Sequence, residues 1–481
     1  MAEMKNKYRF IARIVIETKT PLNIGSGSKS IKTDSLILRD VNGLPFIPGT
    51  TIAGLLRHSL DEEQRKQLMG SQKEGSRLII TEAKMLDENC HVLDGMIPEN
   101  ELNTEFLSHF RKQMTIRQHV KINHKGTAEK HGKFDEEIVL KGTRFCFEME
   151  MISSAKDDEQ SKVDESRFMN LLNHMGSPVF RIGSGSRSGF GEFEVKSCKY
   201  KVLDLSPNKD RQLYLEKSSS LNNNFFDSTE EYKLNPKAEG WTCYTLSIQP
   251  EDFLLFGSGF GNEKGWADMT YVREDYIDWE DPNKIKHRDK VLLIPGSSVK
   301  GAISHRTAFY YNKVKGFFAD KLPEGKTIED FTGKNNPAVV ALFGSEGVKV
   351  KQKMEGKQRG NVLISDVIEL KDLSGKYLNH VSIDRFTGGA IDGALFTEEV
   401  LYAHGQVIPI KLLVNKSAFE DVKNEKGEII RKGGDVEKAF EHALDDICSG
   451  MLPLGGGVNR GNGCFKGSWT KVELLNKEEK K

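Results

Sequence analysis

Two stretches of the chain repeat the same order of apolar and polar positions. Residues 44–58 and 292–305 each read as a short apolar strand, an Ile-Pro-Gly turn, two hydroxyl residues and then a helix. Upstream of each copy lies a glycine-rich loop that ends in a single aspartate, Asp34 in the first copy and Asp268 in the second. The same neighbours in the same order at two places predict an internal duplication.

The hydrophobic periodicity extends this duplication over most of the chain. In the first half it predicts a strand over residues 8–17, a helix over 51–67 and a strand over 77–84. Two later helices, over 164–175 and 435–448, carry apolar residues at i, i+3 and i+4. Each is followed by four glycines and a phenylalanine, and the two rows are displaced by 272 residues. These positions are Gly183, Gly185, Gly189, Gly191 and Phe193, matched by Gly455, Gly457, Gly461, Gly463 and Phe465.

The domain organisation follows from the same pattern. Residues 206–240 are polar and rich in Asn, Ser and Lys, which is typical of a linker. We therefore expect one domain over residues 1–205 and a second over 241–481, each of a usual size. Each half runs from a strand and a helix through a variable middle to a helix, a glycine loop and a strand. This order favours an α+β fold of two tandem ferredoxin-like modules.

Composition narrows the function classes. The 70 basic and 70 acidic side chains balance, so attraction to a polyanion must come from local patches. The six cysteines show no Cys-x-x-Cys or Cys/His spacing, which argues against a structural zinc site and favours reduced thiols. The polar start is unlike a secretory signal, and no apolar run approaches the roughly 18 residues of a membrane span. We expect a cytoplasmic protein that does not bind a membrane.

The glycine-rich loops suit phosphate, because glycine lets backbone N–H groups approach an anion closely. Two familiar nucleotide motifs are nevertheless absent. The loop at residues 183–189 has one residue too many for the dinucleotide fingerprint, and residues 25–30 lack the first glycine of a P-loop. Arg187 and Arg460 beside the late loops favour contact with a phosphate backbone. Purely structural turns remain the alternative.

Asp34 and Asp268 are the candidate catalytic residues. An acidic side chain facing a polyanion repels phosphate, so it suits a proton acceptor or a ligand of a divalent cation better than a binding residue. An aspartate that only caps a turn explains the pattern equally well. Asp40 and Asp275 are weaker candidates for the same role.

His58 and His305 also correspond to each other, on the two helices that follow the Ile-Pro-Gly turns. Their position among apolar helix residues predicts packing rather than acid–base cleavage. The sequence contains no recognisable Ser/His/Asp set, cysteine nucleophile signature or HExxH motif. This favours a macromolecular ligand over a small substrate.

A third pair of segments corresponds, residues 122–138 and 383–400. Each begins with Ile-Asn or Ile-Asp and reaches Phe-x-Glu-Glu before a strand. The first predicts an extended basic hairpin, although a solvated loop without function is the alternative. Its basic side chains are His119, Lys121, His124, Lys125, Lys130, His131 and Lys133.

Taken in order, these motifs resemble the RAMP superfamily, and more narrowly the backbone subunits of type III CRISPR effector complexes. The resemblance rests on the glycine loop and aspartate, the Ile-Pro-Gly-[Ser/Thr]-[Ser/Thr] helix, the Phe-Gly-Ser and Ile-Ser-Asp motifs and the terminal glycine loop. Because it covers nearly the whole chain twice, the chain resembles two fused backbone subunits, as in type III-D variant complexes. It implies a modified RNA-recognition fold in each half and three partners: CRISPR guide RNA, complementary target RNA and other type III effector subunits.

The resemblance also implies an activity. A thumb hairpin in each half, within residues 114–135 and 380–397, kinks the guide–target duplex, and an aspartate beside each kink supports cleavage with Mg²⁺ or another divalent cation. Asp34 and Asp268 then act as catalytic residues and metal ligands. The RNA-binding residues that the resemblance implies are Lys29, Lys32, Lys121, His124, Lys125, Arg187, Lys300, Arg385 and Arg460.

The sequence departs from the family pattern in two places. Ala53 stands where the second half has Lys300, so the two halves are expected to bind RNA differently. The interval from Asp268 to the next Ile-Pro-Gly proline is 27 positions, against 14 in the first half, and its acidic insertion could reposition or occlude Asp268. Two other functions remain open: a guide-RNA-binding scaffold with silent aspartates, and a metal-independent endonuclease that processes guide RNA.

Overall fold

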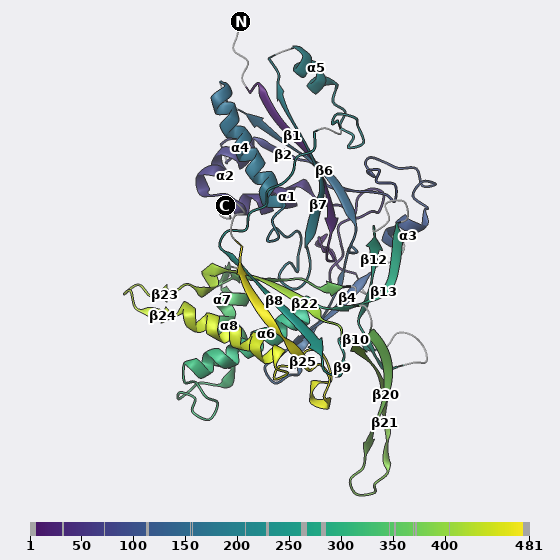
Figure 1. The fold of residues 1–481 in the computed structure, drawn as a ribbon, viewed down its shortest axis with the longest axis vertical. Helices are drawn as coiled ribbons and strands as arrows, with labels where there is room; N and C mark the ends of the chain where they lie inside the picture. Colours follow the sequence, from purple (N-terminus) through teal and green to yellow (C-terminus); the bar gives the residue numbers. More distant parts are fainter. Residues whose placement is uncertain are drawn as a thin grey trace.

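The computed structural model describes residues 6–474 with short gaps. The gaps lie at residues 31–32, 72, 112–114, 154, 156, 207, 228–229, 261–266, 280–284, 346, 351–352, 369, 371–372 and 404. Figure 1 shows two sheet-and-helix units, one from each half of the chain, with long hairpins between and below them. Within the described residues, no helix is both long and apolar enough to cross a membrane.

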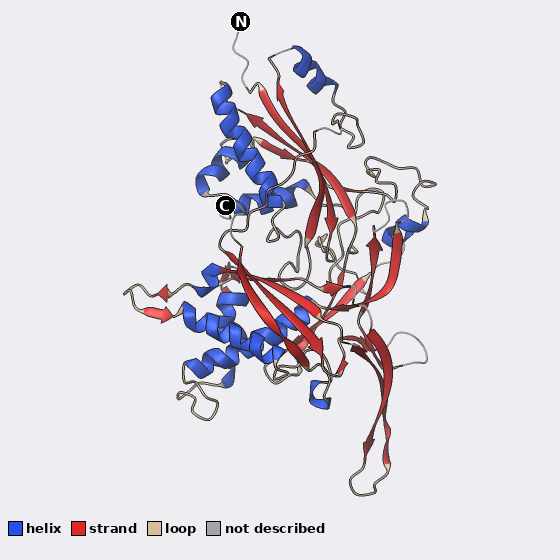
Figure 2. Cartoon of the chain, in the orientation of Figure 1, coloured by secondary structure: helices blue, strands red, loops and turns tan. Residues whose placement is uncertain are grey.

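The first half forms an antiparallel sheet with strand order β2-β6-β1-β7, and β3 also pairs with β6. This is the strand order of a ferredoxin-like βαββαβ unit. Helices α1 and α4 cover one face of the sheet (Figure 2). The elements are β1 (Tyr8–Thr18), α1 (Gly49–Ser59), β2 (Leu78–Ile80), β3 (Lys84–Met85), β6 (Arg144–Ser153), α4 (Asp158–Met175) and β7 (Phe193–Asp204).

The second half repeats this arrangement. Its sheet has the order β18-β22-β8-β25, and α6, α7 and α8 pack against it. The α+β fold with two tandem ferredoxin-like units is therefore confirmed. The elements are β8 (Trp241–Pro250), α6 (Gly296–Val314), α7 (Pro337–Phe343), β18 (Val362–Ile364), β22 (Ile408–Asn415), α8 (Gly433–Cys448) and β25 (Phe465–Glu473).

Alternation along β1 decides which face of the first sheet is covered. Phe10 and Ile14 point toward the helices and lie in the main core with Ile52 and Leu56, which are one turn apart on α1. Ile11 points to the opposite face and belongs to a separate small cluster. Side chains two apart in a strand share a face, and those four apart in a helix share a stripe, so both patterns were readable in the sequence.

The single helix expected over residues 51–67 is in fact two helices. α1 ends at Ser59, and α2 (Glu62–Met69) begins after Asp61. The Asp61 side chain accepts the backbone N–H of Gln64, and the Gln64 side chain accepts the N–H of Asp61. This capping box gives hydrogen-bond partners to the N–H groups of both Asp61 and Gln64, and so favours the start of a new helix at this point.

Three β-hairpins project from these units. β4–β5 and β20–β21 contain the two segments expected to form thumbs, and β20–β21 is longer than the sequence indicated (Figure 1). The third, β12–β13, is the insertion of the second half, and it packs against the first half. There the N–H of Ile277 donates to the carbonyl of Lys141 at 2.9 Å. The hairpin strands are β4 (Ile116–Ile122), β5 (Ala128–Glu137), β12 (Arg273–Asp278), β13 (Lys286–Ile294), β20 (Leu373–Ile383) and β21 (Ala390–Ala403).

The remaining elements are short and connect these parts. The helices are α3 (Glu105–Arg111), α5 (Asn208–Glu216) and the 3₁₀ turns η1 (Ile328–Phe331), η2 (Gly333–Asn335), η3 (Lys416–Phe419) and η4 (Val458–Arg460). The strands are β9 (Phe253–Leu254), β10 (Gly257–Phe260), β11 (Met269–Tyr271), β14 (Gly344–Ser345), β15 (Val348–Val350), β16 (Lys353–Glu355), β17 (Gln358–Arg359), β19 (Val367–Ile368), β23 (Val422–Lys423) and β24 (Ile429–Arg431).

The polar segment between the halves packs partly on the first sheet. It contains α5, and its Phe225 and Phe226 are buried against Ile11, Leu203 and Leu205 on the face away from α1 and α4. Residues 230–232 also run beside β7, where the N–H of Tyr232 donates to the carbonyl of Cys198. The two buried phenylalanines, together with hydrogen bonds from Arg13 to Asn223, hold this otherwise polar segment against the sheet.

The two halves meet at a buried ion cluster. Arg117, at the start of β4, is 4% exposed and donates to the carboxylates of Glu274 and Asp366, which both belong to the second half. Asp366 also accepts the N–H of Gly296 at 2.7 Å, at the start of α6. Burial alone would lower the pKa of Arg117, but Asp366 and Glu274 outweigh it and raise the pKa, so the guanidinium stays charged.

Replacing Arg117 should therefore destabilise the chain strongly. Arg117→Met leaves two carboxylates buried without their cation, and we expect a loss of about 3–5 kcal/mol in the free energy of unfolding, measured by urea denaturation. Lys66→Met removes an exposed ion pair with Glu62 on α2 and should leave the free energy of unfolding almost unchanged. Combining Arg117→Met with Glu274→Gln and Asp366→Asn should recover part of the loss. Equal effects of the Arg117 and Lys66 variants would contradict the assigned role.

Candidate nucleic-acid interface

Asp34 and Asp268 occupy the same place at the two thumb hairpins. The Asp34 carboxylate accepts the N–H of Asp135 on β5 at 3.1 Å, and the Asp268 carboxylate accepts the N–H of Thr397 on β21 at 2.8 Å. In both halves the aspartate N–H donates back to the carbonyl of the same hairpin residue. Both aspartates are exposed. Each loop aspartate is thus tied to the second strand of its hairpin and faces solvent.

The hairpin residues beside these aspartates are also repeated. His119 stacks on Phe134 in the first half, with ring centroids 4.8 Å apart. His380 stacks on Phe396 in the second half at 4.7 Å. Each ring pair is held on neighbouring strands at directly opposed positions. The repetition of both contacts identifies the two hairpin bases as equivalent sites.

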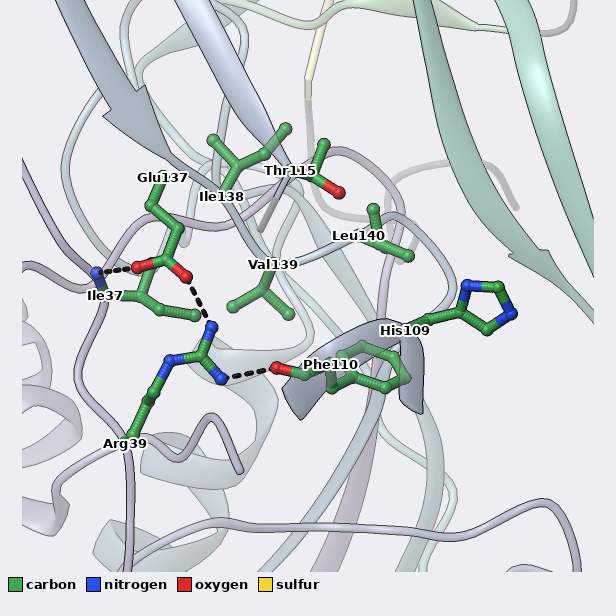
Figure 3. A pocket seen from close by; sticks show the side chains of 9 residues that line it. All are labelled: Ile37, Arg39, His109, Phe110, Thr115, Glu137, Ile138, Val139 and Leu140. Carbon is green, nitrogen blue, oxygen red and sulfur yellow. Dashed lines mark hydrogen bonds and ion pairs between the residues drawn. The ribbon is translucent and has the colours of Figure 1, made fainter. Parts of the chain in front are cut away.

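A repeated ion pair fixes each hairpin to its own half. Arg39 donates to Glu137 in the first half, and Arg273 donates to Glu399 in the second. Figure 3 shows Arg39 between Glu137 and the carbonyl of Phe110, which it also binds. The cavity lined by these residues has a volume of about 10 Å³, which is room for a single water molecule. It is too small to bind a substrate.

The two sites differ in the residue that follows the stacked phenylalanine. In the first half this is Asp135, one of whose carboxylate oxygens is buried without a hydrogen-bond partner. In the second half it is Thr397, whose hydroxyl donates to Asn379 at 2.7 Å. Mg²⁺ prefers one or two carboxylates together with water and substrate phosphate. The first site, with Asp34 beside Asp135, therefore fits a divalent cation better than the second, which has Asp268 alone.

The two late glycine loops adopt a left-handed backbone conformation that favours glycine. All eight matched glycines have positive φ, between 64° and 121°, a region that side-chain-bearing residues rarely adopt. The first loop packs on the second half: Gly189 pairs with Ser365, and a Cβ on Gly189 would lie 1.9 Å from an oxygen of Asp366. The first loop thus forms the junction between the halves, as the structural alternative allowed.

Three cations meet along this junction without a carboxylate. Arg187 of the first glycine loop donates to the carbonyl of Gly360, and Lys300 of α6 lies 3.4 Å from the hydroxyl of Ser188. Burial, followed by the charge of nearby Arg359, lowers the pKa of Arg187 to about 10. Burial also lowers the pKa of Lys300, with a smaller contribution from Arg187. Within the described part of the chain, no carboxylate is among the groups that shift the pKa values of Arg187, Lys300 and Arg359.

A family comparison agrees with the duplicated geometry. The RAMP superfamily model matches residues 15–194 and 278–466, which together make up more than half of the chain. The chain belongs to the RAMP superfamily. Family membership indicates a CRISPR-associated RNA-binding subunit. A search of curated proteins found no match to the chain.

The glycine loop of the second RAMP unit is placed differently from the first. Its Arg460 donates to Glu398 of β21 at 2.5 Å, and Glu398 also contacts His380 at 3.0 Å. A Cβ on Gly461 would meet no atom within 4 Å among the described residues, whereas its counterpart Gly189 is tightly enclosed. The second loop therefore has an open side where the first loop meets its neighbour.

The other predicted RNA-binding residues lie on loops and hairpins. Lys29 and Arg385 are exposed, and Arg385 sits beside Phe386 at the tip of β20–β21, where Phe386 is 99% exposed. Lys121 pairs with Glu129 across its own hairpin at 3.2 Å. Two residues at the tip of β4–β5, His124 and Lys125, lie near Glu329 of the second half, with His124 at 3.5 Å. Lys32 lies outside the described residues.

The packing role expected for His58 and His305 is wrong. Both side chains are exposed on their helices. The buried side of α1 carries Ile52 and Leu56, and the buried side of α6 carries Val299 and Ile303, so the histidines lie outside these buried stripes. Neither histidine contacts the hairpin bases in the described structure. The acid–base role that the sequence already disfavoured therefore gains no support.

The two weaker aspartate candidates, Asp40 and Asp275, form structural hydrogen bonds to backbone N–H groups. Asp40 accepts the N–H groups of Asn42 and Leu44 at 2.9 and 3.0 Å, which makes it a turn aspartate. Asp275 lies on the inserted hairpin β12–β13 and accepts the N–H of Lys290 at 2.8 Å. Neither is held at a thumb base as Asp34 and Asp268 are.

Sequence reasoning named His119 only as one of the basic side chains of the first hairpin, and it overlooked Asp135 and Arg359. A signal for the first two was present, because the Phe-x-Glu-Glu motif recurs in both halves and a histidine precedes each copy. The variable position of this motif is Asp135 in one half and Thr397 in the other. Arg359 had no local signal, since only the contact between the halves brings it near Arg187.

His119 should make the stability of the chain depend on pH. Burial, followed by the charge of Arg117, lowers the pKa of His119 to about 4, and its Nε2 is buried without a partner. The unfolded chain has an ordinary histidine pKa near 6.5 and binds the proton more readily, so stability is lost as the pH falls from about 6.5 toward 4.

A denaturation series measures this effect. Between pH 7 and pH 5, wild type should lose about 1 kcal/mol more of its unfolding free energy than His119→Gln, allowing for solvent screening of a partly exposed ring. His91→Gln, which alters an exposed histidine, should keep the wild-type pH dependence. An unchanged pH dependence in His119→Gln would show that His119 is not held neutral.

Proposed function

We propose that this chain is a backbone subunit of a type III CRISPR effector complex that binds guide RNA and cleaves complementary target RNA. The proposal assigns one metal-dependent site to each RAMP unit. The observation that carries it is the repeated attachment of an exposed aspartate, Asp34 or Asp268, to the second strand of a projecting hairpin. Two sites at fixed separation in one chain suit cleavage at regular intervals along a bound target.

The proposed chemistry uses few protein groups. The hairpin holds the target backbone so that a ribose 2′-hydroxyl faces the adjacent phosphorus, and this positioning supplies much of the rate. Attack by the 2′-oxygen breaks the bond from phosphorus to the 5′-oxygen of the next nucleotide, which leaves with a proton as a 5′-hydroxyl, and the other product ends in a 2′,3′-cyclic phosphate. The carboxylate of Asp34 accepts the 2′-hydroxyl proton or holds the cation near the phosphate. A divalent cation such as Mg²⁺, when bound, stabilises charge on the phosphoryl oxygens. Asp135 supports the first site by adding a second carboxylate beside Asp34.

The junction between the RAMP units is the proposed track for the guide backbone. Partly burying Arg187 and Lys300 without carboxylates costs free energy in the unbound protein, in keeping with their lowered pKa values. RNA phosphates would relieve this cost by supplying the missing negative charge. Sequence specificity then comes from base pairing to the guide, and the protein reads only backbone and shape.

The proposed partners follow from the ends of the repeat. The first glycine loop contacts the second unit, while the second loop and the β20–β21 hairpin lack an equivalent neighbour among the described residues. A contact of this head-to-tail kind does not close on itself, so it suits addition of further subunits. We propose that other type III effector subunits occupy this end, in the manner of a type III-D variant complex.

A guide-binding scaffold is the second candidate function. One observation favours it: each aspartate accepts a hairpin N–H, which is a structural use of the carboxylate. Under this alternative, the aspartates only hold the hairpins, and another subunit cleaves the target. The two functions make different predictions for substitutions that keep the hydrogen bond.

Asparagine variants separate catalysis from hairpin anchoring. Asp34→Asn and Asp268→Asn keep an oxygen that can accept the hairpin N–H but lose the charge needed for a base or a cation ligand. In the reconstituted complex with Mg²⁺ and a labelled complementary RNA, each variant should lose a different product by about 100-fold or more. Asp40→Asn, which alters a turn aspartate, should cleave normally. RNA binding should persist in all three variants.

The alternative outcomes are distinct. Full cleavage by the Asp34→Asn/Asp268→Asn double variant, with loss only in the corresponding alanine variant, would make the aspartates structural and favour the scaffold. Cleavage of repeat RNA that survives EDTA would favour the metal-independent processing function.

Lys300→Gln tests the proposed guide track. Because Lys300 is partly buried without a carboxylate, its removal should leave the unfolding free energy of the RNA-free chain unchanged or slightly higher. Guide-RNA affinity should nevertheless fall, and the slope of log K against log salt should decrease by about 0.7–0.9 for one lost phosphate contact. Lys471→Gln, whose amine pairs with Glu437 and Glu441, should leave RNA affinity unchanged. An unaltered salt slope for Lys300→Gln would exclude this contact.

A further inference from the structure

The inserted hairpin β12–β13 carries a cluster of side chains that the proposed RNA chemistry does not use. Asp275, His287 and Asp289 each offer a ligand atom, and these atoms lie within 4.8 Å of one another. The first lies on β12 and the other two on β13. It is the one group of this kind found within the described residues. The first RAMP unit has no counterpart of this insertion.

The backbone of the hairpin places these three residues together. Strand pairing is regular up to Glu274 and resumes at Tyr276, so that Asp275 faces two residues of β13, Asp289 and Lys290. This is a β-bulge, a feature that redirects side chains within a sheet. The N–H of Lys290 donates to one oxygen of Asp275 at 2.8 Å and fixes that carboxylate. The other oxygen of Asp275 turns toward His287.

The imidazole of His287 is held on several sides but has one unused nitrogen. Its ring stacks on His109 of α3, with centroids 3.5 Å apart and ring planes within 13°. Its Nδ1 lies 2.5 Å from a carboxylate oxygen of Asp289. Its Nε2 is buried without a hydrogen-bond partner and lies 3.8 Å from Asp275 Oδ2. A buried ring nitrogen facing a carboxylate beyond hydrogen-bond reach is an unsatisfied arrangement that needs an explanation.

A shared metal ion explains this separation. Zinc binds histidine nitrogen and aspartate oxygen at roughly 2.0–2.2 Å, so two ligands of one ion can lie up to about 4 Å apart. The 3.8 Å between His287 Nε2 and Asp275 Oδ2 falls within that limit. The Asp289 side chain is 71% exposed, so it can exchange its contact with His287 Nδ1 for the ion by rotating at the surface. Imidazole with carboxylates is a donor set for a divalent transition metal, and the absence of sulfur separates it from a cysteine zinc site.

We propose that Asp275, His287 and Asp289 bind a divalent transition-metal ion, with Zn²⁺ as the best-matched probe, and that this ion fastens the inserted hairpin. The hairpin carries Glu274, one of the two buried partners of Arg117, next to Asp275. It also packs on the first RAMP unit through Trp279, whose indole N–H donates to the carbonyl of Gly142 at 2.6 Å. The ion stabilises the junction of the two units from the surface and does not depend on the RNA-cleaving role.

Zinc binding to the full-length chain tests this directly. Protein stripped with EDTA and dialysed into excess Mg²⁺ is titrated with Zn²⁺, so that any Mg²⁺ site at Asp34 or Asp268 is already occupied. We expect one tightly bound zinc per chain and a higher melting temperature with zinc. His287→Ala should weaken zinc binding by about tenfold or more and abolish the zinc-dependent rise in melting temperature. Co²⁺ in place of Zn²⁺ should give visible absorption bands that the variant lacks.

Matched variants make the outcome decisive. His91→Ala removes an exposed histidine that lies 3.6 Å from Asp87 with no third ligand, and it should bind zinc like wild type. Asp289→Asn changes an exposed side chain, preserves the fold and should also weaken binding, so it decides the question if His287→Ala does not fold. Failure of wild type to bind zinc, or equal binding by wild type and both site variants, would overturn the proposal. Loss of target cleavage in Asp34→Asn leaves this result unaffected.

Discussion

The buried pairing of Arg117 with Glu274 and Asp366 is the interaction on which the relation between the two halves depends. A guanidinium removed from water is tolerated only when carboxylates and hydrogen bonds replace its hydration, and here those partners come from two separate segments of the other half. Asp366 also caps the start of α6 through Gly296 and lies against Gly189. One ion cluster therefore sets the position of a thumb hairpin, a glycine loop and a helix. Since Asp34 is tied to that same hairpin, the cluster also sets where the first candidate site lies relative to the second half.

The duplication preserves the parts of the site that a single half can build and changes the parts that depend on a neighbour. The aspartate at the hairpin, the His–Phe stack and the Arg–Glu pair recur because each is formed within one unit. Arg117 does not recur. The corresponding position in β20 is Leu378, an apolar residue that cannot form an ion pair. The first glycine loop is enclosed by the second unit, whereas the second loop has an open side. Fusion thus allows the two copies to diverge at their contact surfaces while their hairpin bases stay alike.

The insertion β12–β13 illustrates a different consequence of fusion. It belongs to the second half in sequence but extends the core of the first half, where Ile277 is buried among first-half residues. Such a segment increases the apolar area shared by the two units and limits their relative motion. From the sequence, its acidic residues could be expected to reposition or occlude Asp268. In the folded chain, Glu274 pairs with Arg117 and Asp278 pairs with Arg288. Charges that look repulsive in a linear sequence are paired once the hairpin meets its neighbours.

The resemblance to the RAMP superfamily implied the two thumb hairpins, and the sequence by itself determined the duplicated α+β fold, the matched aspartates and the matched glycine positions. These follow from local causes: strand alternation, helix spacing and the backbone freedom of glycine all act over a few residues. It failed where a local pattern was ambiguous, as for His58 and His305, whose exposure depends on which helix stripe meets the sheet. Only the tertiary structure decided that the Asp135 backbone is hydrogen-bonded to Asp34, that Arg187, Lys300 and Arg359 gather at one junction, and that His287 faces Asp275. Each of these depends on contacts between segments far apart in the chain, and such contacts are set by packing and burial rather than by spacing along the sequence.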